Sequence, residues 1–285
     1  MHRVTARLRD AYVRLLARTL DDVPEHVAII QDGNRRYARR HDLDTTAGHS
    51  AGAETARDVL QWGRDLGITE TTLYAFSTEN FERPPEEREA LFDLIAEQLY
   101  ELVDDERIHD DRVRVRAIGD VERLPERVRA AIAAVEGATE TYGQYVLNVA
   151  LAYGGRDVLL SAAQRIAERA AEGDLDPSNI DPEAVAAELY DRPFRDVDLL
   201  IRSGGECRTS NFLPWHAVGA EAPMAVVDSY WPEFSRLDFL RALRVYDKYS
   251  EAKADGQPRG GTGSGLRQPS ELVSGLRSVL HSFRR

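Results

Sequence analysis

The segment HVAIIQDGNRRYARR, residues 26–40, joins a short apolar run to a cluster of charged side chains, and this junction decides how the chain is expected to fold. Residues 26–31 have the length and composition of a buried strand. Asp32 ends the run, and Gly33, which tolerates unusual backbone angles, follows it. If residues 33–36 open a helix, their backbone N–H groups form an anion site, and the arginines nearby add positive charge. The segment is therefore either a polar surface turn or a place where an anion and a metal ion meet.

Similar apolar runs recur along the chain and alternate with segments of helical periodicity. Strands are expected at residues 26–31, 71–77, 113–119, 145–153, 197–203 and 224–229, and helices at residues 51–67, 85–103, 125–139, 157–173, 181–190 and 236–251. This alternation predicts an α/β fold: a single domain with a central, mostly parallel six-stranded sheet flanked by helices. Ligands of such sheets bind at the carboxyl ends of the strands, and polar clusters follow Ile30, Phe76 and Ile201. We therefore expect these three clusters to form one site.

The segments that flank this domain differ from it in composition. Residues 1–22 are expected to form an amphipathic N-terminal helix, and residues 23–253 the α/β domain. Residues 254–285 are expected to combine a flexible linker rich in glycine with a short basic C-terminal helix. The N-terminal helix is expected to pack on the domain, with contact to a membrane surface as the alternative.

The composition limits the classes of function. The 285 residues are 42% hydrophobic and 30% charged, which is usual for a soluble globular protein. A net charge of −12 gives no electrostatic support to nucleic-acid binding. Cys207 is the only cysteine, so no disulfide can form within the chain. The cations are almost all arginine, with lysine only at positions 248 and 253. This acidic, lysine-poor composition suits the high-salt cytoplasm of a halophilic archaeon, and a GC-rich genome is the alternative explanation of the arginine content.

The second polar cluster lies in YAFSTENFERP, residues 74–84. An ordinary strand-to-helix turn is one interpretation, because hydroxyl and amide side chains are common in turns. A ligand-binding loop is the other. Its polar and aromatic members are Ser77, Thr78, Glu79, Asn80, Phe81 and Arg83.

The third polar cluster lies in LLIRSGGECRTSNFLPWHAVGAE, residues 199–221. Two adjacent glycines permit a tight loop, and Arg202, Arg208 and Ser210 supply two guanidinium groups and a hydroxyl around it. This combination is suited to hold a diphosphate. The chain contains neither a GxxxxGKS/T phosphate loop nor a GxGxxG dinucleotide fingerprint after a strand, so neither nucleotide motif is present.

Together these segments resemble a known family. The stretches HVAIIQDGNRRYA, GHSAGA, TLYAFSTENFERP, LNVALAYGGRDV, DLLIRSGGECRTSNFLPW and WPEF occur in the order and spacing of the cis-prenyltransferases, the undecaprenyl diphosphate synthase family, over roughly residues 24–250. The resemblance implies that Mg²⁺ supports the condensation of isopentenyl diphosphate units onto an allylic diphosphate, farnesyl or geranylgeranyl. The implied product is a long-chain polyprenyl diphosphate, the precursor of a glycosyl carrier lipid. The resemblance also implies a hydrophobic tunnel and a homodimer.

The resemblance assigns roles to individual residues. It implies that Asp32 and Asn80 are catalytic and that Asp32 and Glu221 are linked to the metal, Glu221 near a dimer interface. The isopentenyl diphosphate site is implied at Arg202, Arg208 and Ser210. The allylic diphosphate site is implied at Gly33, Asn34, Arg35, Arg36, Tyr37, His49, Ser77, Thr78, Glu79, Phe81 and Arg83.

Five positions depart from the usual pattern of the family. Gln31 replaces a methionine, Arg35 replaces a glycine, Tyr37 and Phe81 each replace a tryptophan, and Thr45 stands near the place of an arginine. Because the aspartate and the diphosphate-binding arginines are retained, we expect an active enzyme. The alternatives are a non-catalytic subunit that supports an active partner, and a phosphate-binding α/β phosphatase or nucleotide protein.

The growing prenyl chain is apolar, so its tunnel must be lined by apolar side chains. Candidates in the strands at 71–77 and 145–153 and the helix at 86–103 include Ala75, Leu91, Ile95 and Leu99, each of which is equally well explained as ordinary core. The expected location is the cytoplasm, with peripheral contact to the inner face of the cell membrane for product release.

Overall fold

The computed structural model describes residues 12–255. The chain divides into two units, Met1–Ser250 and Glu251–Arg285, and only the first five residues of the second, the end of a helix, are described. Residues 12–18 are helical, so the described part of the N-terminal helix ends four residues before the expected end. The rest of that helix and the tail beyond residue 255 lie outside the described residues. No helix within the described range is long and apolar enough to cross a membrane.

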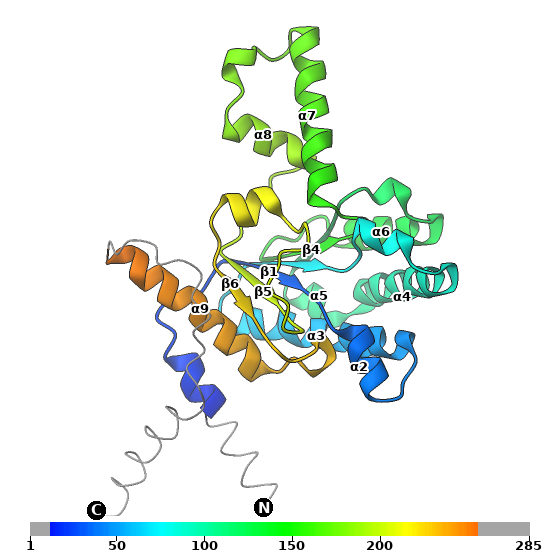
Figure 1. Cartoon of the computed structure of the whole chain (residues 1–285), viewed down its shortest axis with the longest axis vertical. Coiled ribbons are helices and arrows are strands. Elements are labelled where there is room, and N and C mark those ends of the chain that lie inside the picture. The colour runs from blue at the N-terminus through cyan, green and yellow to red at the C-terminus, as the bar shows by residue number, and fades with distance from the viewer. Residues whose placement is uncertain (1–11, 256–285) are drawn as a thin grey trace, which may run out of the picture. The chain divides into compact units, whose positions relative to one another are not determined.

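A six-stranded sheet forms the centre of the first unit (Figure 1). Its strands are β1 (His26–Ile30), β2 (Glu70–Tyr74), β3 (Val113–Ile118), β4 (Tyr145–Ala150), β5 (Leu199–Arg202) and β6 (Met224–Val226). Their order is β3-β4-β2-β1-β5-β6, and every neighbouring pair is parallel. The predicted α/β class and all six predicted strands are confirmed, and the sheet is entirely parallel rather than mostly so.

Helices connect the strands on both faces, as parallel pairing requires. They are α2 (Asn34–Arg40), α3 (Thr45–Asp65), α4 (Pro85–Asp104), α5 (Glu106–Asp110), α6 (Glu126–Ala138), α7 (Gly155–Glu172), α8 (Pro182–Leu189) and α9 (Arg236–Ala254). Helix α3 begins six residues before the predicted start because Asp44 caps it, accepting a hydrogen bond from the Ala47 amide at 3.0 Å. From the sequence, a helix beginning at residues 33–36 was considered but not predicted, and α5 was not predicted at all. Both helices have about two turns or fewer, which is too short to show a clear apolar periodicity.

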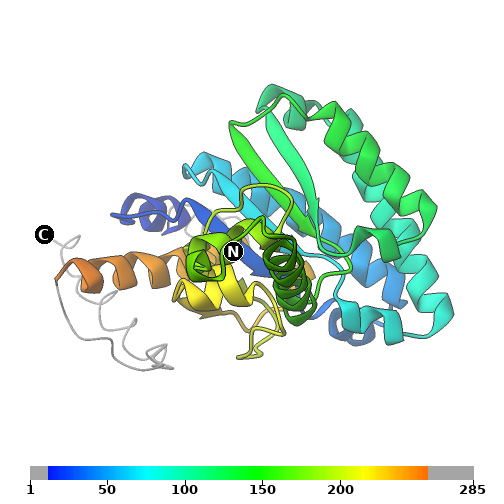
Figure 2. The same cartoon turned by 90° about the horizontal axis from the view of Figure 1, so that it is seen from above.

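Residues of one strand alternate between two cores, because successive side chains of a strand point to opposite faces. Val27 and Ile29 of β1 join the larger core cluster with side chains from α3, α4, α6 and α9. Ala28 lies in the smaller cluster with Leu200 of β5 and Phe212 from the loop that follows β5. Figure 2 shows α4 and α6 beside β3 and β4, and Figure 1 shows α7 and α8 extending together away from the sheet. Both faces are therefore covered near β1, and the ends of the strands are left for polar groups.

Candidate active site

The first polar cluster begins where β1 ends. The Ser203 hydroxyl, from the end of β5, accepts a hydrogen bond from the Asp32 amide at 3.0 Å and donates one to the Asp32 carbonyl at 2.8 Å. The Trp231 amide donates to the same carbonyl at 3.0 Å. Two segments that are distant in the chain, at Ser203 and Trp231, therefore hold the backbone of Asp32 in place.

The Asp32 carboxylate lies between two guanidinium groups. One oxygen, Oδ1, is 3.0 Å from Nη2 of Arg36 in α2, and the other, Oδ2, accepts from Nη2 of Arg202 at 2.7 Å. The Arg202 side chain is only 3% exposed, so this contact is shielded from solvent. A buried arginine needs such a partner, because an unpaired charge in this position would be strongly destabilising.

Arg202 also organises the third polar cluster. Its Nη1 donates to the Arg208 carbonyl at 2.5 Å and to the Ser210 hydroxyl at 2.6 Å. The Arg208 side chain itself is 68% exposed and lies 3.7 Å from a carboxylate oxygen of Glu206. The structure thus joins Arg202 and Ser210 directly, and it leaves the Arg208 guanidinium at the surface of the same loop.

Glycines allow the first and third clusters to approach closely. A Cβ on Gly204, whose φ is +83°, would lie 2.5 Å from Nη2 of Arg36. A Cβ on Gly33, whose φ is +107°, would lie 2.8 Å from the Tyr230 ring. Both positions have a left-handed backbone conformation and little space for a Cβ, so both features favour glycine over any other residue.

Tyr230 is a site residue that the sequence analysis missed. The Arg36 guanidinium lies over its ring at 5.3 Å from the centroid. The signal was available, because Tyr230 directly precedes the WPEF segment that contributed to the family resemblance. Ser203 and Trp231 belong to the same group of missed residues.

Helix α3 packs against the first polar cluster. A Cβ on Gly48 would lie 2.5 Å from the Asn34 carbonyl, and one on Gly52 would lie 2.5 Å from Asn34 Oδ1, so these glycines let α3 approach the start of α2. Between them, His49 has a buried Nε2 with no hydrogen-bond partner among the described residues. Burial, and then the positive charges of Arg83 and Arg35, lower the pKa of His49 from 6.5 to about 4. His49 is therefore neutral at neutral pH.

The second cluster forms a 3₁₀ turn, Thr78–Glu82, which begins four residues after the end of β2 at Tyr74. The Asn80 side-chain oxygen accepts from the Ser77 amide at 3.0 Å, and the Thr78 amide donates to the Tyr153 carbonyl at 3.0 Å. The Phe81 ring packs edge-on against Phe76, with the ring centroids 5.1 Å apart. Glu79 is exposed. The loop is thus an organised turn whose aromatic member is anchored in the core.

The remaining members of the predicted allylic site lie around α2 and α4. Arg83 donates to Glu87 Oε1 at 2.8 Å, and Nε of Arg35 lies 3.5 Å from the same oxygen. The Tyr37 ring packs against the His41 ring at 4.4 Å between the centroids. The structure therefore gathers the residues predicted from α2, α3 and the 77–83 loop at one edge of the sheet.

Glu221 is not part of this gathering within one chain. The π-helix Pro214–Gly219 ends before it, and Glu221 has a left-handed φ of 59°. It precedes β6, whose Met224 is level with Leu200 of β5, so it lies toward the amino ends of the strands. Asp32 follows the carboxyl end of β1, and the two carboxylates are at opposite edges of the parallel sheet.

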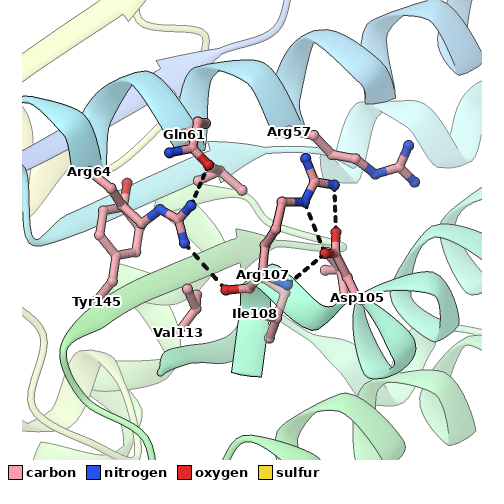
Figure 3. A pocket seen from close by; sticks show the side chains of 10 residues that line it. Arg57, Gln61, Arg64, Asp105, Arg107, Ile108, Val113 and Tyr145 are labelled. Atoms are coloured by element: carbon pink, nitrogen blue, oxygen red, sulfur yellow. Dashed lines mark hydrogen bonds and ion pairs between the residues drawn. The ribbon is translucent and has the colours of Figure 1, made fainter. Parts of the chain in front are cut away.

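A hollow lies at the amino ends of β3 and β4, away from Asp32 (Figure 3). Its walls are Leu60, Leu102, Ile108, Val113 and Tyr145, and charged side chains of Arg57, Arg64, Asp105 and Arg107 form its rim. Figure 3 shows Arg64 bound to Gln61, and Arg107 bound to Asp105. Of the tunnel candidates, Leu91 and Leu99 are buried in the larger core, Ile95 is partly buried against it, and Ala75 is exposed.

The carboxylate and imidazole groups near Asp32 determine which kind of metal ion the site could bind. Within residues 12–255, no group of three or more His, Cys, Asp or Glu side chains could hold a metal ion. Asp32 supplies one carboxylate beside arginines suited to phosphate oxygens. Mg²⁺ is commonly held by one or two carboxylates, water and substrate phosphates, so the donor set fits Mg²⁺ bound together with a diphosphate and does not fit a cage made of protein alone.

A parallel sheet with arginines, a glycine turn and one carboxylate at its carboxyl edge defines a diphosphate-binding α/β protein. A family model described as "Putative undecaprenyl diphosphate synthase" matches residues 30–253. The chain therefore belongs to the undecaprenyl diphosphate synthase family and is an enzyme, a cis-prenyltransferase.

Individual relatives agree. A tritrans,polycis-undecaprenyl-diphosphate synthase (geranylgeranyl-diphosphate specific) of Halobacterium salinarum is 58% identical over 245 residues, 85% of this chain and 81% of that protein. The similarly named enzyme of Methanocaldococcus jannaschii is 47% identical, over 83% and 85% of the two chains. A crystal structure of lavandulyl diphosphate synthase from Lavandula x intermedia with dimethylallyl diphosphate has a TM-score of 0.75 and 32% identity, covering 79% of this chain and 95% of that one.

These matches decide between the hypotheses drawn from the sequence. The α/β phosphatase or nucleotide protein is wrong, because the family match extends from the end of β1 through β2 to β6 and includes all three polar clusters. The non-catalytic subunit has no support, since the relatives are named as synthases. The expected resemblance to haloarchaeal enzymes is confirmed.

Proposed function

We propose that this enzyme condenses isopentenyl diphosphate units with geranylgeranyl diphosphate to give a long-chain cis-polyprenyl diphosphate that serves as the precursor of a glycosyl carrier lipid. The observation that carries the proposal is the Asp32 carboxylate held between Arg36 and Arg202 where two diphosphate-binding clusters meet. The preference for geranylgeranyl over farnesyl diphosphate rests on the names of the archaeal relatives.

The allylic diphosphate binds, in this proposal, at the start of α2. The backbone N–H groups from Gly33 to Arg36 and the Arg36 guanidinium bind its oxygens, and neutral His49 contributes a hydrogen bond. Two observations support this placement: α3 approaches α2 closely at Gly48, and the Nε2 of His49 is buried without a hydrogen-bond partner in the described part of the chain. The remaining predicted residues of this subsite, from Asn34 to Tyr37 and in the 77–83 loop, surround it.

Isopentenyl diphosphate binds at the loop after β5. Arg202, Ser210 and the exposed Arg208 hold its diphosphate, and the adjacent glycines let that group approach the backbone. The support for this subsite is that Arg202 reaches both Asp32 and Ser210, so the two diphosphates would lie on either side of one carboxylate.

Substrate binding exchanges partners at Asp32. In the free enzyme both carboxylate oxygens are bound by arginines. If diphosphate oxygens take up those arginines, the Asp32 carboxylate would be available to hold Mg²⁺, an ion commonly bound by one or two carboxylates together with substrate phosphates. The metal ion supplies stabilisation of the negative charge that develops on the departing diphosphate. The arginines offset the repulsion between the two polyanions.

The residues then support one substitution and one proton loss. The allylic carbon–oxygen bond breaks, a carbon–carbon bond forms to the terminal alkene carbon of isopentenyl diphosphate, and a proton leaves the new unit. The departing diphosphate or a carboxylate accepts that proton. The Asn80 oxygen holds the loop through Ser77, and we propose that its amide N–H donors orient the reacting diphosphate.

The growing chain extends over the sheet face covered by α3 and α4. Leu91, Ile95 and Leu99 line its path, and α4 moves outward to open it, because Leu91 and Leu99 are packed in the core of the unliganded enzyme. The apolar hollow in Figure 3 lies at the far end of this path, at the amino ends of β3 and β4.

The enzyme acts as a homodimer in this proposal. β6 is the last strand of the sheet order, and Val218 on the neighbouring π-helix is 55% exposed, which supports an interface there. Glu221 would then lie at the subunit interface near the metal of the partner's site rather than near Asp32 of its own chain. We also propose a cytoplasmic location with peripheral contact at the inner membrane face, because the product carries a long apolar chain.

One assay tests the proposal. The pure protein is incubated with labelled isopentenyl diphosphate, Mg²⁺ and geranyl, farnesyl or geranylgeranyl diphosphate in turn, at low and high salt, and the products are sized. We expect incorporation to be fastest with geranylgeranyl diphosphate. Absence of incorporation with every primer would refute the proposed reaction, and faster incorporation with farnesyl diphosphate would refute the proposed starter.

A further inference from the structure

One carboxylate joins three elements at the rim of the proposed allylic site. Glu87 lies in the first turn of α4, and its side chain is 16% exposed. Its Oε1 accepts from Nη1 of Arg83, at the end of the 77–83 loop, at 2.8 Å. The same oxygen lies 3.5 Å from Nε of Arg35 in α2. A single oxygen atom therefore bridges two cations that come from different parts of the chain.

The neighbourhood of Glu87 is otherwise positive. Burial lowers the pKa of Arg83, and Arg35 lowers it further, whereas Glu87 opposes that change. His49 of α3 is in the field of the same two arginines and presents a buried Nε2 that has no hydrogen-bond partner in residues 12–255. The Glu87 carboxylate is thus the negative charge that balances Arg35 and Arg83, and the imidazole of His49 lies near the same two arginines. The cluster resembles an anion-binding site in which a side chain of the protein takes the place of the anion.

The position of Arg35 gives this cluster its particular character. Arg35 comes from α2 and approaches the same carboxylate oxygen as Arg83, so it is the second cation of the cluster. A second cation strengthens the attraction for a diphosphate, and it also makes the release of that diphosphate slower. Elongation requires the diphosphate to leave this subsite in every cycle, so the added positive charge requires a nearby negative charge to balance it.

We propose that Glu87 is the internal counter-ion of the allylic subsite: it neutralises Arg35 and Arg83 when the subsite is empty, and it limits the affinity of the subsite for an allylic diphosphate. This inference rests on the proposed function. Glu87 is a positioning residue, because it acts through the two arginines and is not itself a ligand of the substrate. An entering diphosphate competes with Glu87 for the guanidinium groups, and Glu87 takes them back when the diphosphate leaves.

The sign of the effect follows from charge. A diphosphate that approaches Arg35 and Arg83 is repelled by the Glu87 carboxylate a few ångströms away. Salt screens this repulsion weakly near Arg83 and Glu87, which are 19% and 16% exposed, and more strongly near Arg35, which is 57% exposed. Glu87→Gln removes the repulsion and keeps an oxygen that can accept from Arg83. We expect this variant to bind an allylic diphosphate about tenfold more tightly, an effect set by the loss of one nearby charge.

The matched control is Glu86→Gln. Glu86 is the adjacent residue in the same turn of α4, carries the same charge and is exposed. Its replacement changes the net charge of the protein and the first turn of the helix equally, and we expect less than about a twofold change in affinity because solvent screens an exposed charge. Glu87→Asp keeps the charge in a shorter side chain, so its affinity is expected to remain near that of the unsubstituted enzyme.

The test is the dissociation constant of an unreactive allylic probe, geranylgeranyl S-thiolodiphosphate, measured by calorimetry without isopentenyl diphosphate. Tighter binding by Glu87→Gln than by Glu86→Gln, together with a lower KM for the allylic substrate and a lower kcat, would support the inference. The gain should shrink when Arg35→Gln is added, because one of the two competing cations is then missing.

The two levels of the proposal fail in different ways. If the unsubstituted enzyme binds the probe and Glu87→Gln binds it equally or more weakly, the counter-ion role is refuted while the proposed reaction stands. If the unsubstituted enzyme does not bind the probe, the proposed allylic substrate is refuted, and the inference about Glu87 is refuted with it.

Discussion

Gly52 is the point at which the packing of α3 controls the position of the catalytic loop. A Cβ at residue 52 would lie 2.5 Å from Asn34 Oδ1 and 2.8 Å from Cδ1 of Trp231. Trp231 is 1% exposed, and its indole N–H donates to the Gly52 carbonyl at 2.7 Å, so the ring cannot simply move away. In Gly52→Ala the contacts must open by about 1 Å to reach ordinary van der Waals separation.

The expected magnitude combines two opposing effects. Overpacking of a well-filled contact costs about 1–3 kcal/mol, and alanine is favoured over glycine inside a helix by about 1 kcal/mol. We therefore expect Gly52→Ala to lower the free energy of unfolding by up to about 2 kcal/mol, or the midpoint of thermal unfolding by up to about 6 °C. Asn34 precedes Arg35 and Arg36, so a shift of its backbone misplaces the diphosphate site, and kcat/KM should fall by about tenfold or more.

Gly137→Ala is the matched control. Gly137 lies near the end of α6, and nothing lies within 4 Å of a Cβ built there. This variant gains helix propensity without a clash, so its stability should rise by up to about 1 kcal/mol and its activity should not change. Urea unfolding and steady-state kinetics are measured on both variants. If Gly52→Ala were as stable and as active as Gly137→Ala, the close contact of α3 with α2 would not position the site, and the reasoning would be wrong.

Three further outcomes test the site. Asp32→Asn should lower kcat by about 10²–10³-fold, and it should also lower the thermal midpoint because the buried Arg202 loses its charged partner; nearly full turnover would contradict the assigned role. Arg202→Lys cannot reach Asp32 and Ser210 with a planar fork, so KM for isopentenyl diphosphate should rise about tenfold or more, and an unchanged KM would count against the clamp. Burial and two arginines lower the pKa of His49 to about 4, so the unfolded chain binds more protons than the folded chain between about pH 4 and 6.5. The free energy of unfolding therefore falls as the pH is lowered through that window, by at most about 3 kcal/mol from this group. His49→Gln should therefore show a shallower loss of stability over that window, and equal slopes in the two proteins would refute the burial argument.

The sequence by itself determined the elements that depend on local periodicity. The six strands and six of the helices were predictable because each is long enough to repeat its apolar pattern, whereas α2 and α5 are too short to do so. The three polar clusters were also predictable, because they follow strands and the carboxyl ends of parallel strands share an edge. Asp32 was therefore identifiable before any contact was known.

Only the tertiary structure decided which groups hold these clusters together. Ser203 contacts Asp32 across 171 residues of chain, and Trp231 contacts Gly52 across 179, so neither contact leaves a local pattern. The same holds for Tyr230, which makes Gly33 necessary, and for Glu87, which joins Arg35 to Arg83. The spacing of neighbouring side chains determines local secondary structure. Contacts between distant segments form only when the sheet brings the ends of the strands together.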